Sequence, residues 1–283
     1  MRRYFLSGGT GFVGRELCRQ LLAKPDTESV TCLTRGQRPT SSLISHPNLR
    51  YWLGDITQCK FPDESFTDLI HGANEANDLM QPDQYRYYYT IVEGTRRILS
   101  WAEGRITRKL VLSSGAVDRD TVYGQAKRQC ELLANEYGGC KIARIFSLLG
   151  EEMPLNGQFA SGKFVHMALN DGKVKLWGGA SQRTYLHVED CVKELLAILD
   201  DGGTSYPYEV AGNVPMTMLE LAQMVSVVFD VPLERIDGAD RVDVYLPSLG
   251  RTNLFQTIST RAALERIRDY HLRNTDVLAR KSA

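Results

Sequence analysis

The stretch YFLSGGTGFVG, residues 4–14, holds three glycines at intervals of three: Gly8, Gly11 and Gly14. A short apolar run precedes them. A helix-period pattern follows, with apolar residues recurring on one face as far as Leu21. This order predicts a buried strand, a tight turn and an amphipathic helix.

Three glycines at this spacing have a mechanical meaning in a strand–turn–helix unit. The first allows the turn, the second lets a pyrophosphate approach the backbone, and the third lets the helix pack closely on the strand. The helix N-terminus then offers N–H groups and a partial positive charge to phosphate. We therefore expect a dinucleotide site formed by Gly8, Gly11, Phe12, Val13 and Gly14. The alternative is a flexible surface turn, which the amphipathic helix disfavours.

Strand and helix patterns alternate as far as residue 150, which predicts a doubly wound parallel α/β sheet of the Rossmann type. We expect a dinucleotide-binding domain over 1–150, with 183–200 returning to it. The rest, 151–283, predicts a smaller mixed α/β substrate domain. The predicted strands of the first part are 2–7, 29–34, 49–55, 67–73, 108–114 and 140–149, and its helices are 11–23, 89–103 and 123–137.

Composition excludes several classes of function. The chain has 283 residues with 34 basic and 34 acidic side chains, which gives no sign of a nucleic-acid or anionic-membrane partner. Its six cysteines form no CxxC pair and suggest reduced thiols in the cytoplasm. We expect no signal peptide, no membrane span and no metal site, because the sequence lacks the corresponding runs and spacings.

The end of the second predicted strand indicates which cofactor is bound. A carboxylate there binds the ribose 2′-hydroxyl of NAD, whereas an arginine accommodates the 2′-phosphate of NADP. The sequence is CLTRGQR, with Thr34, Arg35 and Arg38 and no acidic residue. We therefore expect NADP rather than NAD. The alternative is that both arginines are solvated loop charges.

A second stretch, LSSGAVDRDTVYGQAK (112–127), suggests proton-transfer chemistry. Tyr123 and Lys127 are four residues apart on a predicted helix and share a face. An ammonium beside a phenol favours the phenolate, as general acid–base catalysis requires. Ser114 ends a strand at the same sheet edge. Only nine positions separate it from Tyr123, but nine extended residues can span about 30 Å. The alternative is two exposed helix residues with no catalytic role.

Together these motifs resemble the extended short-chain dehydrogenase/reductases, in the group of nucleotide-sugar epimerases, dehydratases and reductases. The resemblance extends to about residue 265. Its markers are SGGTGFVG (7–14), GDI (54–56), LIHGAN (69–74), VEGTRRIL (92–99), LSSGAV (112–117), YGQAK (123–127), ARIFSLLG (143–150) and QRTYLHVEDC (182–191).

The resemblance implies a role for individual residues. Ser114 would orient the substrate oxygen, Tyr123 would transfer the proton, and Lys127 would bind the nicotinamide ribose. Further cofactor contacts would come from Asp55 at the adenine, its neighbour Ile56, and His71, Gly72 and Ala73. Substrate contacts would come from Ser147, Arg183 and Arg251. For Arg183, a surface ion pair is an equal alternative.

Three features depart from the family pattern. The loop before Tyr123 is unusually short, which would trim one wall of the sugar pocket. Ile91 replaces a usual asparagine. Gly115 and Ala116 follow Ser114 where 4,6-dehydratases carry an acidic pair and C5 epimerases a cysteine, so we disfavour both of those activities.

The resulting hypothesis is reduction of a 4-keto nucleotide-diphosphate sugar by NADPH. The first alternative is a 4-epimerase with tightly bound NAD. An alternative of another class is a non-catalytic NADP-sensing regulator on the same fold. Base, sugar and stereochemistry stay open. By resemblance alone, the Tyr123 helix and the helix after YRYYYT (85–90) could form a homodimer contact.

Overall fold

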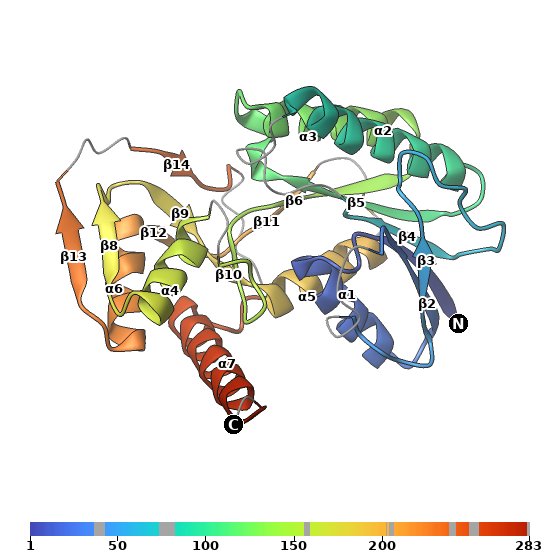
Figure 1. Cartoon of the computed structure of the whole chain (residues 1–283). Coiled ribbons are helices and arrows are strands. Elements are labelled where there is room, and N and C mark those ends of the chain that lie inside the picture. Colours follow the sequence, from blue (N-terminus) through green and yellow to red (C-terminus); the bar gives the residue numbers. More distant parts are fainter. Residues whose placement is uncertain are drawn as a thin grey trace. The chain divides into compact units, whose positions relative to one another are not determined.

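The computed structural model in Figure 1 describes residues 1–36, 43–73, 83–155, 159–201, 203, 207–237, 242–248 and 255–281, the last seven as helical backbone only. The chain divides into two compact units. The first is Met1–Ile145 with Val192–Val210, and the second is Phe146–Cys191 with Ala211–Ala283. Helix α5 (Val188–Asp200) contains one of the boundaries. Which ligand each unit binds stays a prediction.

A seven-stranded sheet forms the centre of the first unit, and every neighbouring pair in it is parallel. The strand order is β11-β6-β5-β4-β1-β2-β3. The chain therefore builds outward from β1 in one direction, then restarts beside it at β4, which makes the β1/β4 junction the topological switch point. This confirms the Rossmann-type sheet. The strands are β1 (Arg2–Ser7), β2 (Thr27–Thr34), β3 (Leu49–Leu53), β4 (Asp68–His71), β5 (Arg108–Ser114), β6 (Cys140–Ile145) and β11 (Tyr208–Val210).

Helices cover both faces of this sheet. Figure 1 shows α2 (Gln84–Ala102) and α3 (Val122–Glu136) side by side over one face, with α1 (Phe12–Ala23) and part of α5 over the other. The apolar stripe expected on α2, which includes Ile91 and Ile98, is buried as predicted. This helix begins five residues earlier than we expected. Asp83 caps it, because its carboxylate accepts a hydrogen bond from the Arg86 N–H at 2.8 Å.

An aromatic cluster fills the core under α2. Phe5 of β1 lies with its ring centroid 4.7 Å from Trp101 and 5.2 Å from Phe66. Phe61 stacks on Trp101 at 5.1 Å. Large aromatic side chains bury the most apolar area per residue, so this cluster fixes β1, and with it the glycine turn, against α2.

The second unit is built from three small sheets and three helices in the described residues. One corrected expectation lies at its start: the strand predicted over 140–149 is two strands, because β6 ends at Ile145 and β7 pairs instead with β10. The elements are β7 (Leu148–Leu149), α4 (Ala160–Asn170), β8 (Val174–Trp177), β9 (Gln182–Thr184), β10 (Leu186–His187), β12 (Pro215–Thr217), α6 (Met218–Phe229), β13 (Leu233–Ile236), β14 (Val244–Tyr245) and α7 (Thr260–Lys281).

Candidate active site

The glycine turn joins β1 to α1 in a packing that side chains would block. Gly8 has φ +82°, and a Cβ added there would lie 2.7 Å from the carbonyl carbon of Gly72. A Cβ at Gly14 would lie 2.0 Å from the Gly8 oxygen. Gly11 is the N-cap of α1, so Phe12 and Val13 form its first turn, whose N–H groups have no acceptor within the helix. Unpaired N–H groups at a helix N-terminus can bind phosphate, and a pyrophosphate at this turn stays a prediction.

The two residues expected to choose the cofactor end β2. Thr34 is buried, and its carbonyl accepts a hydrogen bond from the Gly54 N–H at 2.9 Å. Arg35 is exposed directly after it. The third residue of the prediction, Arg38, lies outside the described residues.

Asp55 follows β3 and is half-buried. Its carboxylate accepts hydrogen bonds from the Thr57 N–H (2.8 Å) and hydroxyl (2.6 Å). Partial burial raises its pKa, but the Thr57 bonds and the charge of Arg35 outweigh this effect and leave the pKa lowered. Ile56 is buried against α2, where a Cβ on Gly94 would meet its side chain at 2.7 Å. Contact of Asp55 with an adenine stays a prediction.

His71 ends β4 and is completely enclosed. Its Nδ1 lies 2.7 Å from the Ser7 hydroxyl and its Nε2 lies 2.9 Å from the Thr95 hydroxyl. Burial, with a smaller effect of the Lys127 charge, lowers its pKa to about 3, so the ring is neutral. Both ring nitrogens are therefore engaged inside the protein. Any cofactor contact in this segment would fall to the backbone and to Gly72 and Ala73.

Tyr123 and Lys127 lie together on α3 as the spacing predicts. The Lys127 ammonium is buried, donates a hydrogen bond to the Leu112 carbonyl at 2.9 Å, and lies 5.8 Å from the centre of the Tyr123 ring. Burial lowers the pKa of Lys127, while Cys130 and Glu131 oppose this effect. The cation thus lies under the phenol ring.

Ser114 is the last residue of β5 and lies next to the start of the short loop. Its hydroxyl accepts a hydrogen bond from the Ala116 N–H at 3.2 Å and caps the 3-10 helix η3 (Gly115–Asp118). Gly115 and Ala116 are buried in that turn. Convergence of Ser114 with Tyr123 and Lys127 on one substrate stays a prediction.

The structure explains how so short a loop reaches α3. Helix η3 packs directly on the first turn of α3, where a Cβ on Gly124 would lie 2.4 Å from the carbonyl oxygens of both Ala116 and Arg119. The Thr121 side chain caps α3 by accepting the Gly124 N–H at 3.0 Å. Arg128 donates from Nε to the Val117 carbonyl at 3.1 Å. A compact turn held by Gly124 and Arg128 thus replaces a longer loop.

We predict that Gly124→Ala separates η3 from α3. Because two backbone oxygens would overlap the new Cβ, we expect a loss of about 1–3 kcal/mol in the free energy of unfolding. Urea denaturation measures this loss. Gln129→Gly, at an exposed position of the same helix, is the control for helix propensity, with an expected loss below about 1 kcal/mol. A Gly124→Ala variant as stable as the parent would contradict this packing.

Ile91 occupies a dry environment beside the catalytic helix. It is 1% exposed and packs with Tyr87, Ala126 and Cys130, and Tyr123 packs against the same cluster. A polar side chain here would lie in an apolar contact. The proton relay through this position that the family asparagine suggests is therefore absent from this chain.

The predicted substrate residues belong to the second unit. Arg183 on β9 binds Asp243 through Nη2 at 2.5 Å, donates to the Asp243 carbonyl at 2.7 Å, and lies 5.5 Å from the centre of the Tyr245 ring. Arg183 thus forms an ion pair with Asp243 in the structure, and a contact with a substrate phosphate stays a prediction. The Ser147 carbonyl accepts a hydrogen bond from the Leu186 N–H at 3.1 Å. Arg251 lies outside the described residues. Substrate contacts stay predictions.

Sequence reasoning missed three positioning residues: Ser7, Thr95 and Arg128. Only Thr95 gave a signal, as a hydroxyl within the apolar stripe of α2. Two further searches covered the described residues. No helix among them combines the length and apolarity that a membrane crossing needs. They also contain no group of three or more His, Cys, Asp or Glu side chains placed to hold a metal ion.

Known proteins match this chain in sequence and in fold. UDP-glucuronic acid decarboxylase 1 of Arabidopsis thaliana is 26% identical over 261 residues, covering 81% of this chain and 58% of that protein. The enzyme of the same name from Danio rerio is 25% identical over 255 residues, covering 79% and 60%. The chain thus spans less than two thirds of the length of these relatives.

The fold agrees with solved structures. An epimerase from Methanothermobacter thermautotrophicus superimposes with a TM-score of 0.84 at 19% identity, covering 99% of this chain and 94% of that one. The dTDP-glucose 4,6-dehydratase DesIV of Streptomyces venezuelae, solved with NAD bound, gives 0.82 at 20% identity and covers 97% and 98%. The model of the NAD-dependent epimerase/dehydratase family matches residues 4–211. Because this match spans well over half of the chain, the protein belongs to the NAD-dependent epimerase/dehydratase family.

Proposed function

We propose that this protein is an NAD(P)-dependent oxidoreductase of nucleotide-diphosphate sugars, and that it reduces a 4-keto sugar nucleotide with NADPH. The observation that carries the proposal is the buried Lys127 ammonium beneath the Tyr123 ring, in the same unit as a closely packed glycine turn between β1 and α1. The relatives named for UDP-glucuronic acid support a nucleotide sugar as the substrate class.

The chain's own residues would divide the work as follows. When bound, the nicotinamide cofactor supplies the hydride. Tyr123 would donate the proton to the oxygen of the keto carbon, and the ammonium of Lys127 would stabilise the phenolate that remains. The Ser114 hydroxyl would hydrogen-bond the same oxygen as negative charge develops on it. Gly8, Gly11 and Gly14, with the first turn of α1, would hold the pyrophosphate.

The preference for NADP depends on the end of β2. Thr34 and the exposed Arg35 stand where a carboxylate would otherwise bind the ribose 2′-hydroxyl. A guanidinium there can pair with a 2′-phosphate. The family and its NAD-bound structures favour the second candidate, a 4-epimerase that keeps its NAD tightly bound.

One experiment separates these candidates. The purified protein is denatured, and the released dinucleotide is identified by mass spectrometry. The native protein is then incubated with NADPH and a UDP-4-keto sugar, and separately with UDP-glucose and UDP-glucuronic acid. Exchangeable NADP and consumption of NADPH support the reductase. Co-purified NAD with interconversion of 4-epimers would establish the epimerase instead, and CO₂ released from UDP-glucuronic acid would establish a decarboxylase.

We also propose that the protein acts in the cytoplasm. All six cysteines are free thiols in the structure, and the sulfur atoms of Cys18 and Cys32 share a hydrogen bond at 3.4 Å. Adjacent unoxidised thiols fit a reducing compartment.

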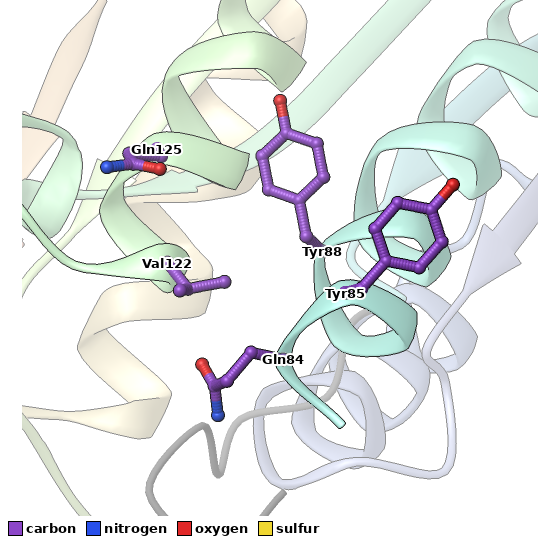
Figure 2. Close-up of a pocket in the computed structure, with 5 residues that line it drawn as sticks. All are labelled: Gln84, Tyr85, Tyr88, Val122 and Gln125. Carbon is purple, nitrogen blue, oxygen red and sulfur yellow. The ribbon is translucent and has the colours of Figure 1, made fainter. Parts of the chain in front are cut away.

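A homodimer through α2 and α3 is the assembly we propose. An open hollow of about 300 Å³ lies between the two helices. Figure 2 shows the side chains that line it: Gln84, Tyr85 and Tyr88 of α2, and Val122 and Gln125 of α3. Tyr85 is 77% exposed, and its ring stacks on that of Tyr89 at 6.3 Å. Exposed tyrosines beside a hollow are typical of subunit contacts. A second copy would bury them by packing its own α2 and α3 here.

We predict that Tyr85→Glu converts the dimer into a monomer. The carboxylate would be buried without a partner in the contact, which costs far more than the contact of one side chain gains. Light scattering after size-exclusion chromatography gives the mass. Trp177→Glu, at an aromatic residue of the second unit that is 59% exposed, is the control and should leave the mass unchanged. A wild-type monomer at high protein concentration would rule the contact out.

A further inference from the structure

A chain of buried hydrogen bonds runs from the glycine turn to α2. The Ser7 hydroxyl lies 3.3 Å from the backbone nitrogens of both Gly72 and Ala73 and 2.7 Å from Nδ1 of His71. On the other side of the ring, Nε2 lies 2.9 Å from the Thr95 hydroxyl. The Thr95 hydroxyl is also 2.8 Å from the Ile91 carbonyl. Ser7 and Thr95 are both 0% exposed, so both hydroxyls are shielded from water.

The direction of each proton in this chain follows from counting donors. The Ser7 oxygen accepts the N–H groups of Gly72 and Ala73, so its own proton points to Nδ1 of His71. The ring therefore carries its proton on Nε2 and donates it to Thr95. The Thr95 hydroxyl donates in turn to the Ile91 carbonyl and can accept the thiol proton of Cys130 at 3.0 Å. Every donor then has an acceptor.

The opposite tautomer would break this arrangement. An N–H on Nδ1 would have to donate to the Ser7 oxygen, which already accepts hydrogen bonds from two amides. The Ser7 hydroxyl proton would then have no acceptor. A charged ring would do the same and would add a second buried cation beside Lys127. Four elements pack around the ring: β1, β5, α2 and α3. The polar side chains that they bring toward it are Ser7, Thr95, Cys130 and Lys127, and none of these can take on a compensating negative charge at a low cost in free energy.

We propose that His71 is a positioning residue for the dinucleotide cradle: held as the neutral Nε2–H tautomer between Ser7 and Thr95, it aims the Ser7 hydroxyl that fixes the Gly72–Ala73 backbone against the glycine turn. The contact that makes this positioning matter is close, because a Cβ on Gly8 would lie 2.7 Å from the Gly72 carbonyl carbon. The expected effect on dinucleotide affinity rests on the proposed function. The predicted tautomer of His71 and the predicted order of the Gly72–Ala73 backbone do not depend on it.

The Ala73 amide reports most directly on this chain. Gly72 also donates to the Ser7 carbonyl at 3.0 Å, whereas the Ala73 N–H has, within the described residues, one bond, to the Ser7 hydroxyl. If the Ser7 hydroxyl is no longer held in this orientation, hydrogen exchange should therefore increase more at the Ala73 amide than at the Gly72 amide.

The first test is made on the wild type, and His71→Gln is used only to assign the His71 signal, because His187 also accepts a backbone N–H on Nδ1, from Glu189 at 3.2 Å. Nitrogen-15 NMR of histidine-labelled protein should show the His71 ring with its proton on Nε2, and this ring should stay neutral at pH 5, where an exposed histidine is largely protonated. His166, exposed on α4, serves as the internal comparison. A His71 ring protonated on Nδ1, or charged at pH 6, would overturn the proposal.

The second test removes the anchor on α2. Thr95→Val keeps the shape and deletes the hydroxyl, and amide hydrogen exchange at Ala73 should rise by about fivefold, as the loss of one net hydrogen bond predicts. NADP and NAD titrated by calorimetry should bind about fivefold more weakly. Thr95→Ser should restore both values.

Thr90→Val is the matched control, because the Thr90 hydroxyl makes the same bond to the carbonyl four residues earlier, at 2.8 Å to Arg86, and no bond to His71. An equal change in Thr90→Val, or unchanged Ala73 exchange in Thr95→Val, would overturn the proposal. Should the wild type bind neither dinucleotide, the proposed function fails, and the tautomer and the exchange rates still decide the role of His71.

Discussion

Tyr123→Phe is expected to lower kcat by about 10²–10⁴-fold, the range that a positioned general acid contributes. The ring would keep its place, because it packs against the Ile91 cluster and over the Lys127 ammonium through carbon atoms. Dinucleotide affinity should fall by no more than about fivefold, since at most one hydrogen bond is lost. Single-turnover kinetics measures the change in kcat, with the nucleotide sugar that the NADPH assay shows to be the substrate. Calorimetry measures the change in dinucleotide affinity.

Two further variants serve as comparisons for Tyr123→Phe. Tyr137→Phe, at the other end of α3, should leave kcat unchanged. Lys127→Met should be as inactive as Tyr123→Phe yet lose little in Tm. It relieves the burial of an ammonium, although it leaves the Leu112 carbonyl without its donor. If Tyr123→Phe retained wild-type kcat, the acid–base role would be lost and the non-catalytic regulator would become the better hypothesis.

The sequence allowed the Rossmann-type sheet to be predicted because its signals are local. The glycine spacing, the apolar runs and the buried stripe that includes Ile98 each depend on residues within one element. The same holds for Tyr123 and Lys127, whose four-residue spacing places them on one face of α3. Element ends were less accurate. The α2 start depends on one capping carboxylate, that of Asp83, inside a tyrosine-rich run.

Partners that come from distant segments could not be predicted. Asp243 binds Arg183 from 60 positions away, and no local pattern announces it. The chain through Ser7, His71 and Thr95 joins three elements, and each residue alone looks ordinary. The short loop between Ser114 and Tyr123 could be predicted only in part. The distance that it can span followed from its length, whereas its packing on Gly124 required the coordinates.

Gly14→Ala is expected to abolish measurable dinucleotide binding. The new Cβ would lie 2.0 Å from the Gly8 oxygen and 2.7 Å from the Gly9 Cα. Both contacts are with backbone, so no side chain can rotate away. The helix α1 must instead move off the turn, which withdraws its N–H groups from the pyrophosphate position. Overpacking of this kind costs about 1–3 kcal/mol of stability as well.

Loss of stability alone must not be mistaken for loss of the cradle. Gly172→Ala provides the comparison, because Gly172 has φ +61° and nothing within 4 Å of an added Cβ. It should cost about 1 kcal/mol through backbone strain and leave NAD and NADP affinity unchanged. Urea denaturation and calorimetry on both variants separate the two effects. A Gly14→Ala protein that binds a dinucleotide within twofold of the wild type would show that the pyrophosphate does not lie over this turn, since its geometry cannot survive that methyl group.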